Sequence, residues 1–421
     1  MSQLITQELR ARGAAQVIVE LEQPVAAEAA EPRAAATAAA AAVAGIERHF
    51  TASKLSQDSA LAAATGRPAP PPVRYYPNLG LALGTVTRQG LAGLRADARV
   101  ARVAGAPPLS LIRPVRMTAA PPLPETTWGI DALGVPRLWG EGLTGDGVLV
   151  GHLDTGVDGQ HPALQGAIVS FAEFDPLGFE VEPAPQPHDT DGHGTHTAAT
   201  IAGRPVDGQA VGVAPGASLS SAVVIEGGNV VARVLAGMNR FAGQVDPSRA
   251  SILSMSLGFR GWLDDFLLIT DALRARNILP VFAVGNEGPG TSRSPGNYQQ
   301  ALSVGAVDRG LVVAWFSSSQ RLARRLDPIV PDLVAPGVGV VSARPGGGWI
   351  SMDGSSMATP HAAGLAALLL QARPEATADQ LEQAIFASCR RPPGMWEQRG
   401  GRGVPDAPRA LATLLKPAAA A

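Results

Sequence analysis

The sequence contains a single cysteine, Cys389, among 421 residues. No disulfide bond can form within the chain, so its fold must be stable without covalent cross-links. Lysine occurs only at positions 54 and 416, and the formal net charge is −2. A chain with this balance presents no general positive field to nucleic acid or to anionic membranes. We therefore expect neither nucleic acid nor a membrane as a partner, and we expect a monomer.

Long apolar runs are also missing. Residues 34–46 are rich in alanine and residues 362–372 are apolar, but both stretches are too short to span a bilayer. The first residues, MSQLITQELRARG, contain no apolar segment of the length found in signal peptides. We therefore expect a cytoplasmic protein, with secretion as the alternative if a signal peptide precedes this sequence.

The composition changes near residue 125, and the part before it has its own pattern. Propensity and spacing predict strand and helix in the order β-α-β-β-α-β, which is typical of a small α+β, ferredoxin-like domain. The predicted elements are a strand over 16–21, a helix over 34–49, two extended pieces within 73–87, a helix over 88–96 and a strand over 98–103. Six prolines follow within 107–124, which predicts an extended linker. We divide the chain into domains at 1–106 and 128–421, joined by the linker 107–127.

From residue 128 onward, short apolar stretches alternate with helical patterns. Such stretches are typical of strands that are buried on both faces of a parallel sheet. Strands are predicted over 148–153, 219–225, 252–257, 278–284 and 301–307, and helices over 230–241 and 264–276. The sequence therefore predicts an α/β domain with a doubly wound, mostly parallel sheet and helices on both faces. In such folds, ligand sites lie at the carboxyl ends of the strands.

Asp154 is the first residue with a predicted chemical role. It follows the apolar stretch 148–153 in the motif Asp-Thr-Gly, so its carboxylate is expected at the carboxyl end of a strand. Asp-Thr-Gly is also the motif of aspartic proteases, in which two carboxylates share one proton. The sequence has no second Asp-Thr-Gly or Asp-Ser-Gly, which argues against that class. An aspartic protease would be active at acid pH and indifferent to serine-directed reagents.

His193 lies between two glycines in the stretch Asp-Gly-His-Gly-Thr-His. Glycine permits close approach of the backbone, so the ring can be held at the start of a helix. A zinc site formed by His188, His193 and His196 is an alternative interpretation. However, His193 and His196 are three residues apart rather than four, and no glutamate lies between them, unlike in the zinc-binding helix motif. From this segment alone, a purely structural histidine also remains open.

Ser356 and Asn286 complete the set of candidate residues. Ser356 lies in Gly-Ser-Ser-Met-Ala-Thr-Pro-His, directly before the predicted apolar helix 362–371. A serine in this position could simply cap the helix. The free N–H groups at the start of a helix also favour a negatively charged oxygen. Asn286 follows the apolar stretch 278–284 and could either form a turn or donate a hydrogen bond to such an oxygen.

Taken together and in order, seven stretches of the sequence resemble the subtilisin-like (subtilase) serine proteases. The matching stretches are VLVGHLDTGVDGQHPAL, DTDGHGTHTAATIAG, SMSLG, VFAVGNEG, SVGAVD, DLVAPG and GSSMATPHAAG. They fall within residues 128 to about 412, and the order Asp, His, Ser is one of the three chain orders in which the catalytic triad is known. The stretch VRYYPNLGLALGTVTRQGLAGLRADARVARV resembles the propeptide domain of the same family.

The resemblance implies a serine endopeptidase that works through an acyl-enzyme. Ser356 would be the nucleophile, and His193 would be the base that takes its proton. Asp154 would orient His193 and stabilise its cation. Asn286 would form the oxyanion hole together with the backbone N–H of Ser356.

The resemblance also implies a self-processing zymogen. Domain 1–106 would assist folding and then act as the protein's own intramolecular inhibitor. Processing is expected between Pro114 and Trp128. Two alternatives stay open, namely an inactive protease that serves as a binding scaffold, and a zymogen that is kept latent by its propeptide.

Polypeptides are the expected substrates. The segment 254–258 resembles the family's substrate-binding strand, on which a peptide pairs as an added strand. Small residues in 283–285 and 294–296 resemble the walls of the S1 pocket, so a broad preference for apolar P1 residues is expected. The expected substrate-binding residues are Ser254, Met255, Ser256, Leu257, Gly258, Ala283, Val284 and Gly285.

No cofactor or metal is expected to take part in the chemistry. Many family members bind calcium through an aspartate, but this chain has Ala163 at that position, directly after His161 and Pro162. A structural calcium ion is therefore left open.

Overall fold

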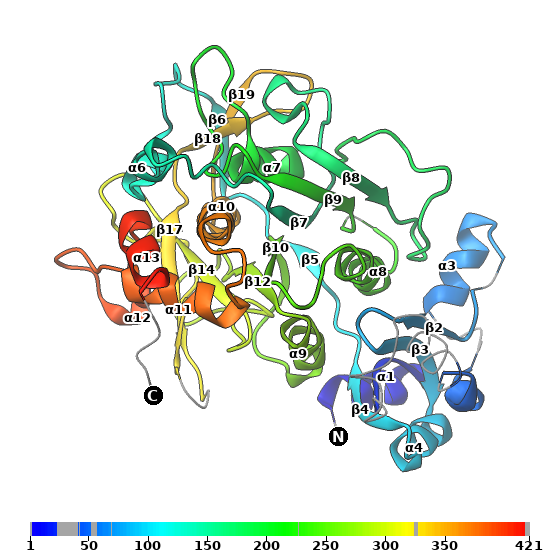
Figure 1. Cartoon of the computed structure of the whole chain (residues 1–421). Helices are drawn as coiled ribbons and strands as arrows, with labels where there is room; N and C mark the ends of the chain where they lie inside the picture. The colour runs from blue at the N-terminus through cyan, green and yellow to red at the C-terminus, as the bar shows by residue number, and fades with distance from the viewer. Residues whose placement is uncertain are drawn as a thin grey trace.

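The computed structural model describes residues 2–22, 41, 43–51, 57–68, 70–225, 227–323 and 327–416. Its largest sheet has seven strands in the order β17-β14-β12-β10-β7-β9-β8, and each neighbouring pair is parallel (Figure 1). These strands are β7 (Leu149–Asp154), β8 (Ile168–Glu173), β9 (Ser218–Val223), β10 (Ser251–Met255), β12 (Ile278–Ala283), β14 (Leu302–Val307) and β17 (Leu333–Pro336). The predicted doubly wound sheet is confirmed, whereas β8 and β17 were not predicted.

Helices cover both faces of this sheet. One face carries α7 (His193–Ala202), α10 (Ser355–Ala372), α11 (Ala378–Ser388) and α13 (Ala407–Leu414), and the other carries α8 (Val230–Ala242) and α9 (Leu267–Ala275). Successive strand residues point to opposite faces. Ile252 accordingly packs in the cluster under α10, and the next residue, Leu253, packs in the cluster under α8 and α9. The helix predicted over 264–276 begins as a 3-10 turn, η4 (Asp264–Phe266).

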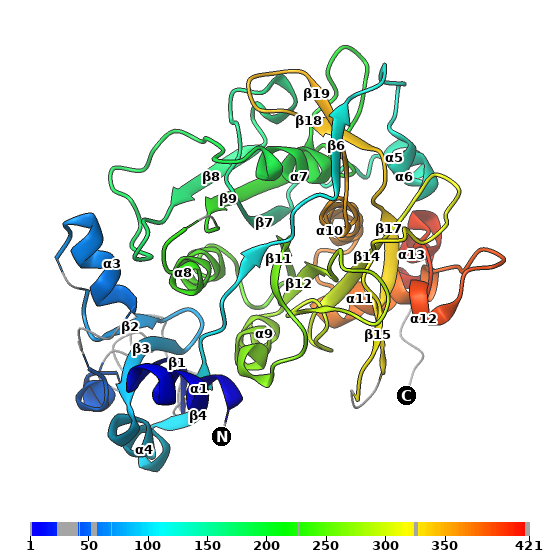
Figure 2. The same cartoon turned by 180° about the vertical axis from the view of Figure 1, so that it is seen from behind.

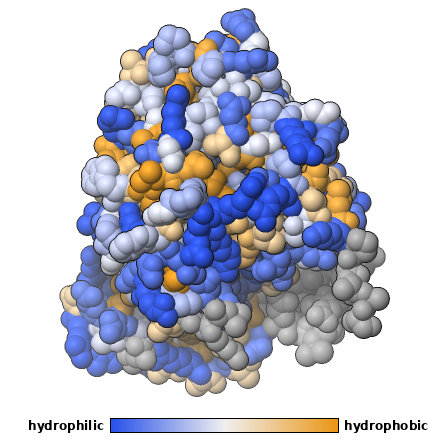
Figure 3. All heavy atoms as spheres, turned by 90° about the vertical axis from the view of Figure 1, so that its left-hand side faces the viewer, coloured by the Kyte–Doolittle hydropathy of each residue, from blue (hydrophilic) through white to orange (hydrophobic). Residues whose placement is uncertain are grey.

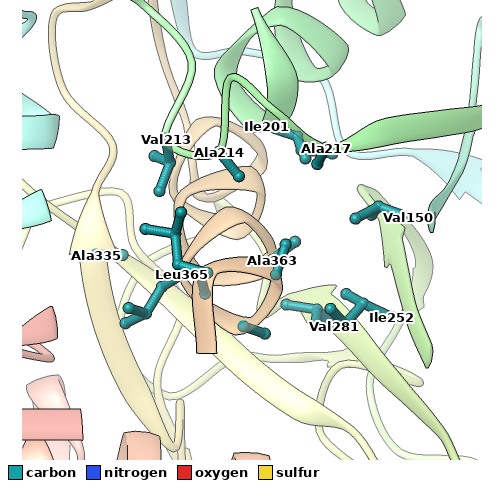
Figure 4. Packing of buried hydrophobic residues seen from close by; sticks show 14 of the residues in the cluster. Val150, Ile201, Val213, Ala214, Ala217, Ile252, Val281, Ala335, Ala363 and Leu365 are labelled. Carbon is teal, nitrogen blue, oxygen red and sulfur yellow. The ribbon is translucent and has the colours of Figure 1, made fainter. Parts of the chain in front are cut away.

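Helix α10 runs through the interior, and small residues allow this. Figure 4 shows Ala363 of α10 facing Val281 and Ile252 of the sheet, with Val213 on another side of the helix. At Gly364 an added Cβ would lie 2.6 Å from the Val213 Cβ, which is too close for any larger residue. The apolar stretch predicted as a helix is therefore the buried centre of the domain.

The N-terminal part forms a separate four-stranded antiparallel sheet in the order β2-β3-β1-β4. Its elements are α1 (Gln3–Arg12), β1 (Ala14–Leu21), η2 (Glu47–His49), α3 (Gln57–Thr65), β2 (Val73–Tyr76), β3 (Leu81–Thr87), α4 (Arg88–Ala96) and β4 (Val100–Gly105). The strand order is that of a ferredoxin-like sheet. Helices α1 and α3 were not predicted, and residues 34–40 and 42 of the helix predicted over 34–49 lie outside the described residues.

This sheet packs against α8 (Figure 1) and also contacts the segment around η4. Leu81 and Leu83 share an apolar cluster with α8 and α9. The Asn78 backbone N–H donates to Asn239 Oδ1 at 2.8 Å, and the Gly105 N–H donates to Asp265 Oδ1 at 2.6 Å. The contact therefore combines an apolar centre with backbone hydrogen bonds.

A single segment then crosses the larger domain, from the N-terminal sheet to its far side (Figure 2). It contains β5 (Ser110–Leu111) and β6 (Arg116–Ala119). Strand β5 joins the small sheet β13-β11-β5, and β6 joins the small sheet β18-β19-β6. Their partners are β11 (Leu257–Arg260), β13 (Arg293–Ser294), β18 (Val340–Ala343) and β19 (Trp349–Asp353).

The remaining short elements lie at the periphery. They are α5 (Trp128–Ala132), α6 (Val135–Gly140), η3 (Pro162–Leu164), β15 (Gln320–Arg321), β16 (Ile329–Val330) and α12 (Glu397–Gly400). Figure 3 views the side that carries α6, α12 and α13 and shows apolar patches within a mostly polar surface. Within the described parts of the chain, no helix is both long enough and apolar enough to cross a membrane.

Candidate active site

Asp154 is the last residue of β7 and His193 is the first residue of α7, and their side chains are in contact. His193 Nδ1 lies 2.7 Å from Asp154 Oδ1, and both side chains are buried. Burial lowers the pKa of His193, but the Asp154 carboxylate outweighs it, so the pKa is raised above its ordinary value. Because the carboxylate can only accept, Nδ1 carries the proton and Nε2 is an acceptor. Nε2 has no hydrogen-bond partner among the described residues.

The glycines beside His193 are needed for this geometry. Gly192 precedes the helix with a left-handed φ of 97°, a conformation that glycine adopts without steric cost. At Gly194 an added Cβ would lie 2.0 Å from the carbonyl oxygen of Gly156. The loop after β7 and the start of α7 can therefore approach closely only through glycine, as the sequence indicated.

Asp189, which the sequence analysis did not single out, braces the same loop. Its Oδ1 accepts from the Thr155 hydroxyl at 2.7 Å and from the Gly192 N–H at 2.9 Å, and its Oδ2 accepts from the Thr195 N–H at 2.7 Å. Burial raises the pKa of Asp189, but these hydrogen bonds outweigh it and lower the pKa below its ordinary value. The ionised carboxylate thus ties the segment after β7 to the first turn of α7.

Ser356 is the second residue of α10 and is fully buried beneath the crossing segment. In a regular helix its carbonyl would accept the N–H of the residue four positions later, but that residue is Pro360, which has none. The Ser256 hydroxyl donates to the Ser356 carbonyl oxygen at 3.2 Å instead. The predicted substrate strand and the predicted nucleophile are therefore directly connected.

Asn286 lies just beyond β12, and its amide orientation is fixed by Ser355. Asn286 Oδ1 accepts both from the Ser355 N–H and from the Ser355 hydroxyl, each at 2.8 Å. The Nδ2 group must then point the other way, where it donates to the carbonyl oxygen of Arg113 at 2.9 Å. The Ser355 hydroxyl therefore helps to set this orientation.

The crossing segment passes directly over these side chains. The Ile112 N–H donates to the Ser256 carbonyl at 3.0 Å, and the Ser356 hydroxyl donates to the Ile112 carbonyl oxygen at 2.6 Å. The next carbonyl, that of Arg113, is the one bound by Asn286. Ser356 and Asn286 therefore contact two successive carbonyl groups of one extended segment.

The predicted substrate-binding residues take different places. Ser256, Leu257 and Gly258 contact the crossing segment, with Leu257 opposite Leu111 and Gly258 opposite Ser110. Ser254 and Met255 are instead paired within the main sheet, in β10. Ala283 ends β12, and an added Cβ at Gly296 would lie 2.3 Å from its carbonyl oxygen. The two predicted walls of the S1 pocket are therefore adjacent.

Val284 and Gly285 hold the neighbouring loops together. The Val284 carbonyl accepts from the Arg293 N–H at 2.9 Å, and the Gly285 N–H donates to the Ser355 hydroxyl at 3.3 Å.

The other two histidines of the alternative zinc site have separate environments. His196 is buried with Nε2 3.0 Å from the Val340 carbonyl oxygen, and burial lowers its pKa to about 3. His188 is partly exposed beside Glu173, with 3.6 Å between His188 Nε2 and Glu173 Oε2. Within the described residues, no group of three or more His, Cys, Asp or Glu side chains could hold a metal ion.

Comparison with known proteins identifies the family. A model described as the subtilase family matches residues 145–403. The chain is 34% identical to subtilisin-like protease PopC of Myxococcus xanthus over 310 residues, which cover 67% of this chain and 63% of that protein. It is 38% identical to subtilisin Savinase of Lederbergia lenta over 249 residues, 59% of this chain and 85% of the relative.

A third relative is the major intracellular serine protease of Bacillus subtilis, 33% identical over 274 residues, which cover 63% of this chain and 81% of the relative. The matched region covers less than two thirds of PopC, so this chain is compared with only part of that protein. The family match spans β7, α7, Asn286 and Ser356 in a single run. The chain belongs to the subtilase family.

Proposed function

We propose that this chain is a serine endopeptidase, made as a latent precursor, that cuts polypeptides with Ser356, His193 and Asp154. One observation supports this most directly: Ser356 and Asn286 contact neighbouring carbonyl groups of one extended segment, and Arg113 of that segment is paired with Asp191, two residues before His193. His193 Nε2 would take the proton of the Ser356 hydroxyl as Oγ attacks a carbonyl carbon. Asp154 would hold the Nδ1–H tautomer and stabilise the imidazolium that forms.

Asn286 would stabilise the oxyanion of the tetrahedral intermediate. Its Nδ2 is already aimed at a carbonyl oxygen, and its Oδ1 is held by Ser355, so little reorganisation is needed during the reaction. The backbone N–H of Ser356, at the start of α10, would be the second donor. Subtilases need no cofactor for catalysis, and each step uses groups of the chain itself.

Substrates would bind as an added strand on β11. The crossing segment uses this mode, with Leu111 opposite Leu257 and the Ile112 N–H bound to the Ser256 carbonyl. Ile112 takes the position of the residue whose carbonyl faces the nucleophile, and its side chain is buried. We therefore propose a preference for apolar P1 residues. Cleavage of a peptide library tests it, and acceptance of basic P1 residues alone would contradict it.

Domain 1–106 would be the propeptide, 107–127 the linker and 128–421 the catalytic domain. The N-terminal sheet makes an apolar contact with α8 and α9. This contact supports a propeptide that stabilises the α8 and α9 face of the catalytic domain and stays bound to it. The crossing segment lies within this linker and covers Ser356. A substrate therefore cannot reach the nucleophile until the linker leaves.

The linker is held one residue out of register for cleavage. In a productive complex, Ser356 attacks the carbonyl whose oxygen occupies the oxyanion hole. Here Ser356 faces the carbonyl of Ile112, while Asn286 binds that of Arg113. The two requirements fall on two different peptide groups, so neither peptide bond is aligned for attack.

Contacts of the linker with Asp191 and with Asp353 keep this offset in place. The Arg113 guanidinium lies 2.8 Å from the Asp191 carboxylate, and that of Arg116 lies 2.9 Å from Asp353. The Val115 N–H also donates to the Asp353 carbonyl at 2.8 Å. Residues 120–125 lie outside any strand or helix and are partly or fully exposed. We therefore place the first cut within 114–128 and assign it to a second molecule.

Fluorophosphonate labelling followed by mass spectrometry tests the proposed activity. Labelling of Ser356 is expected only after the linker is cut, and N-terminal sequencing should then place the new terminus between Pro114 and Trp128. An inactive scaffold would never be labelled. Cutting of the purified Ser356→Ala chain as readily as wild type, with no mature enzyme added, would exclude self-processing.

The order of the processing reaction tests the register argument. Precursor loss should accelerate with protein concentration, and a trace of mature enzyme should cut the Ser356→Ala chain. Concentration-independent processing of the wild-type chain would refute cleavage by a second molecule.

Two relatives are named intracellular serine proteases, from Paenibacillus polymyxa and Bacillus subtilis. Their names support a cytoplasmic location for this chain as a proposal, with secretion as the alternative. Fractionation of cells of the source organism, followed by detection of the labelled protein, separates the two.

A further inference from the structure

A second buried histidine, His152, lies behind the proposed catalytic carboxylate. It is two residues before Asp154 on β7, and alternate residues of a strand point to the same face. The two side chains are 1% and 2% exposed, and His152 Nε2 lies 4.0 Å from Asp154 Oδ2. Helix α7 lies over this part of β7 and β9 (Figure 1). The proposed mechanism makes no use of His152.

Two polar side chains, those of Thr197 and Ser221, connect His152 to Asp154 and to the neighbouring strand. His152 Nδ1 lies 2.9 Å from the hydroxyl oxygen of Ser221, its partner in register on β9. His152 Nε2 lies 2.9 Å from Thr197 Oγ1 on α7. The Thr197 hydroxyl in turn donates to Asp154 Oδ2 at 3.3 Å. All of these side chains are buried, so the contacts are shielded from water.

The two carboxylate oxygens of Asp154 accept hydrogen bonds from different donors. Oδ1 accepts from the Thr155 N–H and from His193 Nδ1, each at 2.7 Å. Among the described residues, Oδ2 accepts a hydrogen bond from the Thr197 hydroxyl alone. A buried carboxylate oxygen without a donor is costly, because it has lost the water that would otherwise solvate it.

The proton positions along this chain of contacts follow from counting donors. Thr197 has one hydroxyl proton, and its use toward Asp154 requires that Thr197 accept from His152 Nε2–H. The neutral ring then presents the Nδ1 lone pair to the Ser221 hydroxyl. Burial lowers the pKa of His152 despite the nearby carboxylates of Asp154 and Asp189, which favours this neutral form, and the His193 ring lowers it further.

The Thr197 hydroxyl has two competing acceptors in its own helix. The carbonyl oxygens of His193 and Gly194 lie 3.2 and 3.1 Å away. A carboxylate is the stronger acceptor, and a hydroxyl that accepts from an N–H group becomes a better donor. The contact with His152 therefore directs the Thr197 proton toward Asp154.

We propose that His152, Thr197 and Ser221 form a positioning relay that holds Oδ2 of Asp154 and so fixes the carboxylate against His193. This inference rests on the proposed function, because its consequence is a change in proton transfer by His193. None of the three residues touches substrate. With the relay intact, the carboxylate cannot rotate, and Oδ1 stays aligned with His193 Nδ1.

The first test compares Thr197→Val with Thr200→Val. Both threonines are buried in α7, but the Thr200 hydroxyl donates to the His196 carbonyl at 2.8 Å and does not contact Asp154. Loss of a hydrogen bond to a charged group predicts a fall in kcat of about 10- to 100-fold for Thr197→Val, with KM unchanged. Thr197→Ser, which keeps the hydroxyl, should restore most of the activity.

A second pair of variants, with smaller changes, provides the test if Thr197→Val does not fold. Ser221→Ala removes the outer end of the relay, whereas Ser220→Ala removes a neighbouring hydroxyl that bonds to Gln244 at 2.5 Å. Ser221→Ala should lower kcat more than Ser220→Ala, and its effect should vanish in a Thr197→Val or Thr197→Ala background because the relay is already broken.

The outcomes separate this inference from the proposed function. Suppose that wild type and Thr200→Val are both active and that the kcat of Thr197→Val lies within about two-fold of theirs. This change is well below the loss expected for a hydrogen bond to a charged group, so the relay would be refuted while the proposed protease function would stand. Equal losses in Thr197→Val and Thr200→Val, or additive effects of Ser221→Ala, would also refute it. If no form of the wild-type protein labels at Ser356, the proposed function itself fails.

Discussion

The hydrogen bond between Ser256 and Ser356 predicts a stability coupling between two distant parts of the chain. The Ser356 carbonyl lacks its helical partner because Pro360 has no N–H, and the Ser256 hydroxyl donates to it at 3.2 Å. Both serines are buried, at 2% and 0% exposure, so water cannot replace this donor. Ser256→Ala should therefore lower the free energy of unfolding by about 1–3 kcal/mol, the cost of a buried carbonyl without a partner.

Pro360→Ala provides the matched background for this prediction. Alanine restores the N–H that a helix normally offers to the carbonyl four residues earlier. Ser256→Ala should then cost about 0.5 kcal/mol or less, the range of changes without a structural cause. The difference between the two backgrounds measures the coupling in a double-mutant cycle.

Urea unfolding of Ser356→Ala chains measures these differences without self-digestion. The change in free energy follows from the midpoint shift multiplied by the common slope. If Ser256→Ala costs the same with Pro360 and with alanine at that position, the hydroxyl does not act through the Ser356 carbonyl. A cost below about 0.5 kcal/mol with Pro360 present would refute the reasoning as well.

Three further predictions concern the mature enzyme. Asn286→Ala should lower kcat by about 100- to 1,000-fold with little change in KM, as for loss of one oxyanion donor, and an equal rise in KM would contradict this role. The raised pKa of His193 means that the base is protonated, and activity lost, as pH falls through a value above about 6.5, so an acid limb of kcat/KM well below that value would refute the assignment. Gly296→Ala would place a Cβ 2.3 Å from the Ala283 carbonyl, and peptides with large P1 residues should be cut more slowly than by wild type, whereas unchanged rates would show that this wall does not border the pocket.

Much of the fold could be predicted because the central strands are short apolar stretches bounded by glycine or polar residues. The stretch 278–284, for example, becomes β12 (Ile278–Ala283) and is buried throughout. Strand β8 was missed because it is only partly buried at the edge of the sheet, and its sequence IVSFAE mixes polar and apolar residues. Helix α1 was missed because its sequence, QLITQELRAR, buries only Ile5 and Leu9 and so carries a weak apolar pattern.

Part of the candidate site could likewise be predicted from the sequence, and part could not. Asp154, His193, Asn286 and Ser356 could be picked out because each lies in a distinctive short motif. The relay of His152, Thr197 and Ser221 could not, because it depends on the pairing of β7 with β9 and on the placement of α7. The register of the linker on Ser356 and Asn286 likewise depends on contacts between residues about 170 to 240 positions apart.

The pairing of β5 with β11 and of β6 with β19 has a consequence for the choice of targets. Once the linker leaves, the two strands on either side of Ser356 each present an unpaired edge. A target that fills both must offer about ten residues of extended chain, roughly 33 Å at the usual rise per residue. Compact native proteins rarely expose such a length, so the enzyme would discriminate between its targets by their conformation as much as by their side chains.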